Sequence, residues 1–170
     1  MPQMTEPKEL LLHELGDLLY AERRFLTATK TMARETQDPA VKRRVEQHVG
    51  ETETHIERLE KAFESIGEKA KGEKCEAAIG LREEHDSFKS EEKPSKTILE
   101  AFDLGSGLRI EHYEIAGYRS AIAVANALGH AECARILQEN LREEEEFAKF
   151  LESAAPAALK KLFAQAEAES

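Results

Sequence analysis

The feature of this sequence that most constrains its fold is a stripe of apolar residues at alternating spacings of four and three. Residues at these spacings share one face of an α-helix. Three further stretches, 39–66, 95–128 and 130–153, repeat the pattern, so the sequence predicts four long amphipathic helices. In the first stretch, 7–35, the stripe consists of Leu11, Leu15, Leu18, Glu22, Phe25, Thr29 and Met32.

Prolines and glycines indicate where these helices begin and end. Asp38-Pro39 is typical of a helix cap followed by the first helical residue, and Gly67 and Gly129 are typical of left-handed stops. Only about four residues separate the first two helices, which favours an antiparallel hairpin. We expect Pro156 to break the chain, leaving a short amphipathic helix over 157–168.

The segment 67–94 differs from the rest because glycine, proline, serine and lysine interrupt it. It contains one short predicted helix, about 74–89. A connection of this length can carry the chain from one end of a bundle to the other, so that the second and third long helices run parallel. The expected fold is therefore all-α: one domain over 1–170, an antiparallel four-helix bundle with a long crossover and a short C-terminal helix.

Composition and charge exclude several classes of protein. The net charge is −10 and no basic cluster is present, which argues against nucleic acid as a partner. No apolar run approaches 18 residues, so we expect no membrane partner. Cys75 and Cys133 are far apart and read as free thiols, and we expect a reducing compartment, the cytoplasm.

Glu22, Glu111 and Glu144 each occupy a stripe position that the flanking spacing assigns to an apolar residue. A lone buried carboxylate is too costly to keep its charge, so it must be protonated, paired or bound to a metal. Any one of them could instead be a solvated residue beside the stripe, and a 100° rotation of the fourth helix would bury Glu143 in place of Glu144. Three of them, near the middles of separate helices, suggest a common partner.

Further candidate ligands flank these glutamates. His48, Glu51 and His55 fall within about 60° on one flank of the second helix, and Glu114 lies one turn beyond Glu111. Carboxylate oxygen with some imidazole nitrogen suits iron or manganese in a bundle core. Our candidate metal ligands are Glu22, Glu51, His55, Glu111, Glu114 and Glu144. His48 is a weaker candidate, and His112 points about 100° away from Glu111.

Several segments resemble the YciE/YciF-like ferritin-like proteins, which are bacterial stress-associated proteins related in fold to rubrerythrins. They are Leu19 to Glu22, His48 to Thr52, Ile56 to Glu60, Gly72 to Cys75, Ile110 to Tyr118 and Leu141 to Glu144. The resemblance implies a homodimer and a two-iron centre. In it, Glu22 and Glu51 are ligands from the first half, and Glu111, Glu114 and Glu144 are ligands from the second.

The chain departs from that family in its nitrogen ligands. A ferritin-like Glu-x-x-His is missing, because Thr54 stands three residues after Glu51, with His55 one residue later. In the fourth helix Glu146 and Phe147 stand where the other histidine belongs.

Three functional hypotheses follow. The first is a two-iron protein that reacts with oxygen or peroxide during stress, and which needs an outside reductant because the chain has no CxxC pair. The second is a non-catalytic structural or interaction dimer with a vestigial metal site. Iron storage is a weaker third, since it requires a large cage.

Overall fold

Five α-helices account for the regular structure of residues 3–169, the part of the chain that the computed structural model describes. They are α1 (Pro7–Glu35), α2 (Pro39–Ser65), α3 (Glu76–Glu91), α4 (Lys96–Ala127) and α5 (Ala131–Glu169). The four predicted long helices and the short crossover helix are confirmed, and their starts and ends lie close to those expected except at the C-terminal end of α5.

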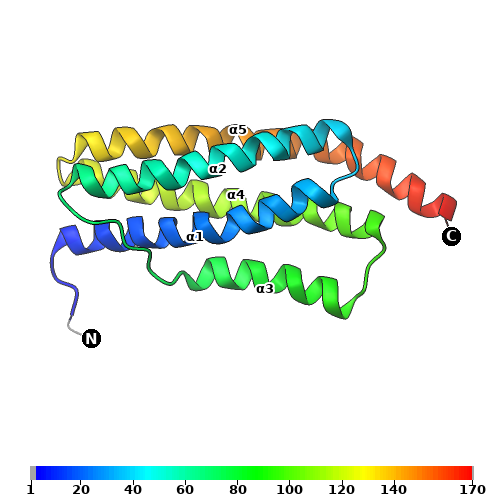
Figure 1. The fold of residues 1–170 in the computed structure, drawn as a ribbon, viewed down its shortest axis with the longest axis horizontal. Helices are drawn as coiled ribbons and strands as arrows, with labels where there is room; N and C mark the ends of the chain where they lie inside the picture. The colour runs from blue at the N-terminus through cyan, green and yellow to red at the C-terminus, as the bar shows by residue number, and fades with distance from the viewer. Residues whose placement is uncertain (1–2, 170) are drawn as a thin grey trace.

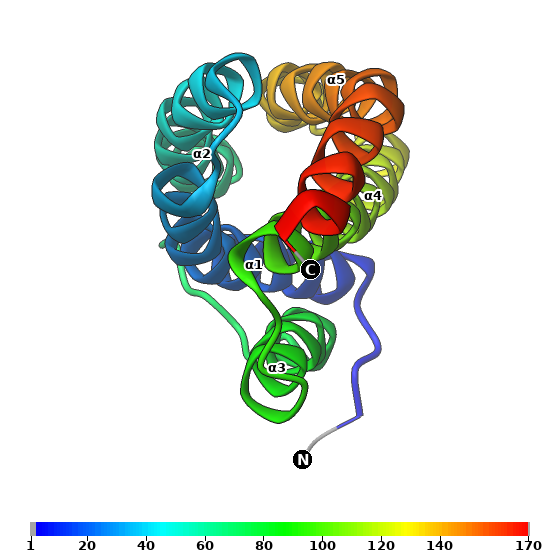
Figure 2. The ribbon, with the colours of Figure 1, turned by 90° about the vertical axis from the view of Figure 1, so that its right-hand side faces the viewer.

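The four long helices form an antiparallel bundle with α3 outside it (Figure 1). α1 packs beside α2 and α4, and α5 packs beside α4 and α2. α3 lies against α1 and α4 and carries the chain back along the bundle, so α2 and α4 run in the same direction (Figures 1 and 2). The predicted crossover topology is therefore present.

Local chemistry sets the helix ends as expected. The Asp38 carboxylate accepts hydrogen bonds from the backbone N–H groups of Ala40 and Val41, at 2.9 and 3.2 Å. Gly67 and Gly129 both have φ of 77°, a left-handed conformation that glycine adopts without strain. The loop between α1 and α2 is also fixed to α4, because Glu100 accepts from the N–H of Gln37 at 2.9 Å.

The crossover is held against α1 at a glycine. The N–H of Glu73 donates to the carbonyl oxygen of Gly16 at 2.9 Å. A Cβ at Gly16 would lie 2.9 Å from the carbonyl oxygen of Lys71 and 2.7 Å from a side-chain carbon of Glu73. Only glycine therefore allows this close approach.

The expected break at Pro156 is wrong: α5 continues through it, and residues 157–168 belong to the same helix. Proline removes one intrahelical hydrogen bond, to the carbonyl of Glu152, but both residues are exposed and water can satisfy that carbonyl. Beyond the proline, Leu162 is only 5% exposed, in a cluster with Val41 and Leu151. That contact holds the second half of the helix on the bundle.

Two of the three apolar clusters in the described chain lie on either side of a polar belt, and the third, around Phe25 and Cys75, joins α1 to the crossover. Of the two clusters beside the belt, one surrounds Leu15, Leu59 and Tyr118 near the start of α1, and the other surrounds Val45, Leu104 and Leu151 near its end. Buried glutamates and histidines occupy the level between them. None of the helices within residues 3–169 is long and apolar enough to cross a membrane.

Candidate metal centre

All four bundle helices contribute buried acidic or imidazole side chains to the polar belt. Each of these side chains belongs to a residue that is at most 2% exposed. They are Glu22 from α1, His48 and His55 from α2, Glu111 and Glu114 from α4, and Glu144 from α5. Five of the six candidate ligands predicted from the sequence are therefore at one level of the bundle.

Five of these six side chains, all but Glu114, form two groups that share one carboxylate. Glu22, His55 and Glu144 form the first group, and His48, Glu111 and Glu144 the second, with their candidate ligand atoms within 4.8 Å of one another. Glu144 presents Oε1 to His55 Nδ1 at 2.9 Å and Oε2 to His48 Nε2 at 3.5 Å. We call them the His55 group and the His48 group. A carboxylate with one oxygen in each group is suited to bridging two metal ions.

Most of the inward-facing donor atoms make no hydrogen bond within the described chain. These buried atoms are Glu22 Oε2, His55 Nδ1, Glu111 Oε2, Glu114 Oε1 and both Glu144 oxygens. His55 Nδ1 and Glu144 Oε1 are close but not aligned as donor and acceptor. Each unsatisfied buried polar atom costs about 1–3 kcal/mol, so such a concentration fits a cation that would satisfy several at once.

Carboxylates outside the belt orient both imidazoles. His48 Nδ1 lies 3.0 Å from Glu51 Oε2, and His55 Nε2 lies 2.9 Å from Glu143 Oε2. A carboxylate accepts a hydrogen bond, so in each ring the outer nitrogen keeps its hydrogen and the inner nitrogen is the one available to a metal. This carboxylate–histidine arrangement is common around protein-bound metals.

Two predicted ligands belong to neither group: Glu114, which is buried beside both groups, and Glu51. The Glu51 carboxylate is 16% exposed and pairs with Arg44 at 2.9 Å in addition to His48. Of the two alternatives on α5, Glu144 is the buried one, while Glu143 is held by Arg58 at 2.6 Å. His112 pairs with Glu152 on the surface, as its predicted direction implied.

His48 lies closer to the centre than the sequence indicated. Its ring stacks on Phe147 with centroids 3.8 Å apart, and Phe147 is one of the two residues that stand where the resemblance would imply a histidine. The nitrogen donor of that group comes from α2 instead. The seven-residue spacing of His48 and His55 was the available signal, because it places both rings on one face two turns apart.

A hydrogen-bond network closes the His55 side of the belt. The Tyr118 hydroxyl donates to Glu22. The Asn140 amide donates to the Tyr118 oxygen at 2.9 Å and to the carbonyl oxygen of His55 at 3.2 Å. Together with Glu143 and Arg58, these groups fix both Glu22 and His55.

Without a bound cation, the electrostatics of the belt favour protonation of both imidazoles and of two of the buried carboxylates. Burial alone would lower the pKa of both imidazoles, but the surrounding carboxylates raise the pKa of His48 to about 10 and that of His55 to about 11. Burial and the neighbouring carboxylates raise the pKa of Glu114 well above its usual value, and burial with Glu111 does the same for Glu144. When all four buried carboxylates are ionised and both imidazoles are neutral, their total charge of about −4 would balance the charge of two divalent cations.

This fold and belt define a class: helical bundles with a crossover and a carboxylate–histidine cluster in the core. Residues 6–164 match the family described as a domain of unknown function, DUF892, and the chain belongs to that family. Protein YciF of Escherichia coli (strain K12) is 33% identical over 143 residues, covering 83% of this chain and 85% of YciF. The resemblance to YciF-like proteins is thus confirmed.

Solved structures agree with that assignment. The crystal structure of the E. coli stress protein YciF is 30% identical, with a TM-score of 0.84 over 93% of this chain and 99% of that one. YcfI from Rhodopseudomonas palustris, described as a candidate structural protein, is 35% identical, with a TM-score of 0.83 over 88% of this chain and 95% of that one.

Proposed function

We propose that this protein is a ferritin-like metal-binding protein that holds two iron ions in the polar belt. The observation that carries the proposal is the concentration of buried, unsatisfied donor atoms in two groups that share Glu144. The proposed ligands are Glu22, His48, His55, Glu111, Glu114 and Glu144. Glu51, expected from the sequence to be a ligand, acts here through His48.

The donor chemistry supports iron, with manganese as the alternative. Carboxylate oxygens combined with imidazole nitrogens suit both metals, and no cysteine sulfur belongs to either group in the described chain. When bound, two ferrous ions would supply the two electrons that, together with two protons from solvent, reduce one molecule of hydrogen peroxide to two molecules of water. The relative from E. coli is described as a stress protein, which agrees with a reaction with oxygen or peroxide.

The chain's own residues have distinct roles in this proposal. Glu51 and Glu143 hold the outer N–H groups of the imidazoles, so that the inner nitrogens face the belt. Tyr118 donates to one oxygen of Glu22 and leaves the other for a cation. The apolar clusters on both sides exclude water, which strengthens the electrostatic attraction between the carboxylates and a bound cation.

The proposal includes a homodimer and a cytoplasmic location. The free, buried state of Cys75 and Cys133 supports a reducing compartment. The dimer rests on the family resemblance, and the molecular mass in solution tests it.

Metal stoichiometry tests the function. We expect two irons per wild-type chain after anaerobic titration with Fe(II), and less than one in Glu144→Gln, because that carboxylate serves both groups. Glu146→Gln is the matched control, since Glu146 is exposed and pairs with Arg142 on the surface. Wild-type protein that binds no Fe(II), or equal binding by Glu144→Gln, would refute the proposal.

A second candidate function is a non-catalytic structural dimer with a vestigial metal site. It is favoured by the 2.9 Å approach of His55 to Glu144, which a protonated imidazole would turn into an ion pair without any metal. The relative described as a candidate structural protein also favours it. This alternative requires a melting temperature that stays the same when a chelator is added to protein isolated from iron-supplemented cells.

A further inference from the structure

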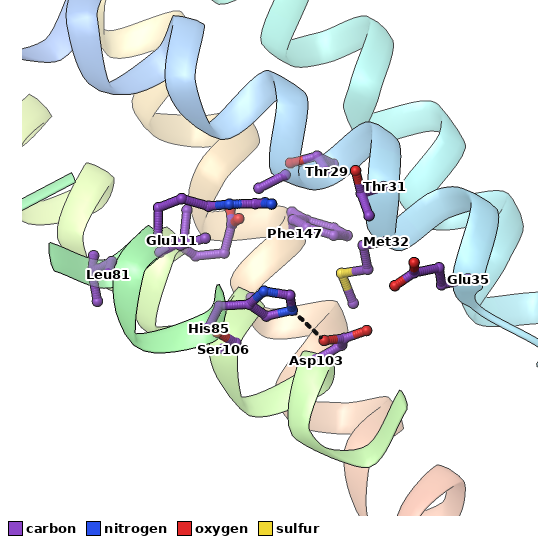
Figure 3. A pocket seen from close by; sticks show the side chains of 14 residues that line it. Thr29, Thr31, Met32, Glu35, Leu81, His85, Asp103, Ser106, Glu111 and Phe147 are labelled. Carbon is purple, nitrogen blue, oxygen red and sulfur yellow. Dashed lines mark hydrogen bonds and ion pairs between the residues drawn. The ribbon is translucent and has the colours of Figure 1, made fainter. Parts of the chain in front are cut away.

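A small cavity lies between α1, α3 and α4, and its lining includes Glu111 and, from α5, Phe147 (Figure 3). Its volume is about 40 Å³. Glu111 and Phe147 both contact the His48 group. The cavity therefore leads to the His48 group, whereas Tyr118, Asn140 and Glu143 surround the His55 group.

The lining of the cavity suits an uncharged occupant. Met32, Ile110 and Phe147 contribute apolar surface, and Gly107 contributes bare backbone. Apart from Glu111, the charged residues of the lining are paired: Glu35 with Lys89 at 2.9 Å, Arg82 with Asp86 at 2.9 Å and His85 with Asp103 at 2.8 Å. Because these charges are already balanced, the part of the cavity away from Glu111 offers little attraction to a free cation.

The size of the cavity limits the occupant to very small molecules. At about 40 Å³, the cavity has room for a few water-sized molecules. A diatomic molecule or hydrogen peroxide fits in this space.

We propose that this cavity binds a neutral oxidant, dioxygen or hydrogen peroxide, and delivers it to the Glu111 side of the centre. The delivery step rests on the proposed function, whereas binding in the cavity does not. The two candidate metal positions are then inequivalent: the oxidant reaches the one at His48, and the one at His55 remains enclosed.

Gly107 gives a way to close the cavity. A Cβ built there lies 3.6 Å from the Met32 sulfur and 3.5 Å from a Leu151 methyl group, which is ordinary contact. Gly107→Ala should therefore fold and narrow the cavity, and Gly107→Val should fill more of it. Gly105 is two residues away on the same helix, and a Cβ there meets nothing within 4 Å. Gly105→Ala and Gly105→Val are thus matched controls.

The first experiment uses xenon, a neutral probe of suitable size that needs no metal. Crystals pressurised with xenon should show a xenon peak beside Met32 and Phe147 in wild type and in Gly105→Val. The peak should be lost in Gly107→Val and weaker in Gly107→Ala. Wild-type crystals without this peak would overturn the binding site.

The second experiment follows delivery with Fe(II)-loaded protein in stopped-flow mixing, with dioxygen in one arm and hydrogen peroxide in the other. We expect Gly107→Ala to slow oxidation at least about fivefold for the molecule that uses the cavity, because one methyl group occupies much of such a small space. Gly105→Ala should react as wild type does, and anaerobic Fe(II) binding should be equal in all variants. Wild-type rates for Gly107→Ala in both arms would overturn delivery, whereas wild-type protein without bound Fe(II) would instead refute the proposed function.

Discussion

At the scale of single residues, Glu114 makes the clearest test of the polar belt. It is buried, one of its oxygens has no hydrogen bond, and burial with the nearby carboxylates raises its pKa well above the usual value. A carboxyl group whose pKa is raised by folding contributes stability below its unfolded pKa, and this contribution is lost as the pH rises.

Glu114→Gln should therefore stabilise the metal-free protein at neutral pH, by about 1 kcal/mol or more. The gain should shrink toward zero as the pH is lowered to about 4.5, where the unfolded glutamate also becomes protonated. Urea unfolding of chelator-treated protein at several pH values measures this difference. The exposed variant Glu84→Gln is the control. A Glu114→Gln variant that is less stable at every pH would contradict a raised pKa.

Metal binding should expel protons. In the metal-free protein the pKa of His48 is about 10 and that of His55 about 11, so both imidazoles are protonated at neutral pH. A metal needs the inner nitrogens without hydrogen, so its affinity should weaken from about pH 8 to about pH 6 as protons compete. Calorimetry with Mn(II) in buffers of different ionisation enthalpy detects the released protons. Heats that do not depend on the buffer would rule out this exchange.

The residue scale also shows what periodicity can and cannot predict. Glu22, Glu111 and Glu144 interrupt apolar stripes, and that interruption correctly predicted their burial. Glu51 and His48 lie on the flank of an apolar stripe, where the sequence predicts the direction in which a side chain points but not how deeply it is buried. Arg44 draws Glu51 outward and Phe147 supports the His48 ring, and both contacts depend on how the helices pack.

At the scale of secondary-structure elements, the crossover depends on one close contact. Gly16→Ala should lower the free energy of unfolding by about 1–3 kcal/mol, because its Cβ would press on the carbonyl of Lys71. Gly50→Ala is the control in α2, where a Cβ meets nothing, and it should add about 0.5–1 kcal/mol. Thermal and urea unfolding measure both. Equal stabilisation by the two substitutions would mean that the crossover does not rest on α1.

Helix ends were predictable where local chemistry sets them, and the exception is instructive. Asp38-Pro39, Gly67 and Gly129 act through their own backbone and nearest neighbours. The effect of Pro156 depends instead on an exposed carbonyl and on the burial of Leu162 against residues far away in the sequence. Those contacts become visible only in the folded chain.

At the scale of the whole molecule, a bound metal should hold the four bundle helices together, because each of these helices supplies a candidate ligand atom. A metal present at about 100 times its dissociation constant stabilises the folded state by about 2.7 kcal/mol, or roughly 5–10 °C in Tm for a chain of this size. The Tm measured with Mn(II) should exceed the Tm measured with chelator by at least that much. Equal melts would favour the structural alternative.

The bundle topology also belongs to this scale. The length of the segment 67–94 predicted a crossover, since a short connection cannot span a bundle. The sequence did not indicate that α3 would lie against α1 and α4 rather than on the other side. That choice places α3 over the cavity beside Glu111, and it follows from packing such as the stacking of Phe88 on Phe102.

The most direct measurement is anomalous diffraction at the iron absorption edge from crystals grown with Fe(II) under anaerobic conditions. We expect two peaks on either side of the Glu144 carboxylate, one beside Glu22 and His55 and the other beside His48 and Glu111. Crystals without anomalous density among these side chains, or with iron only on the surface, would contradict the central claim.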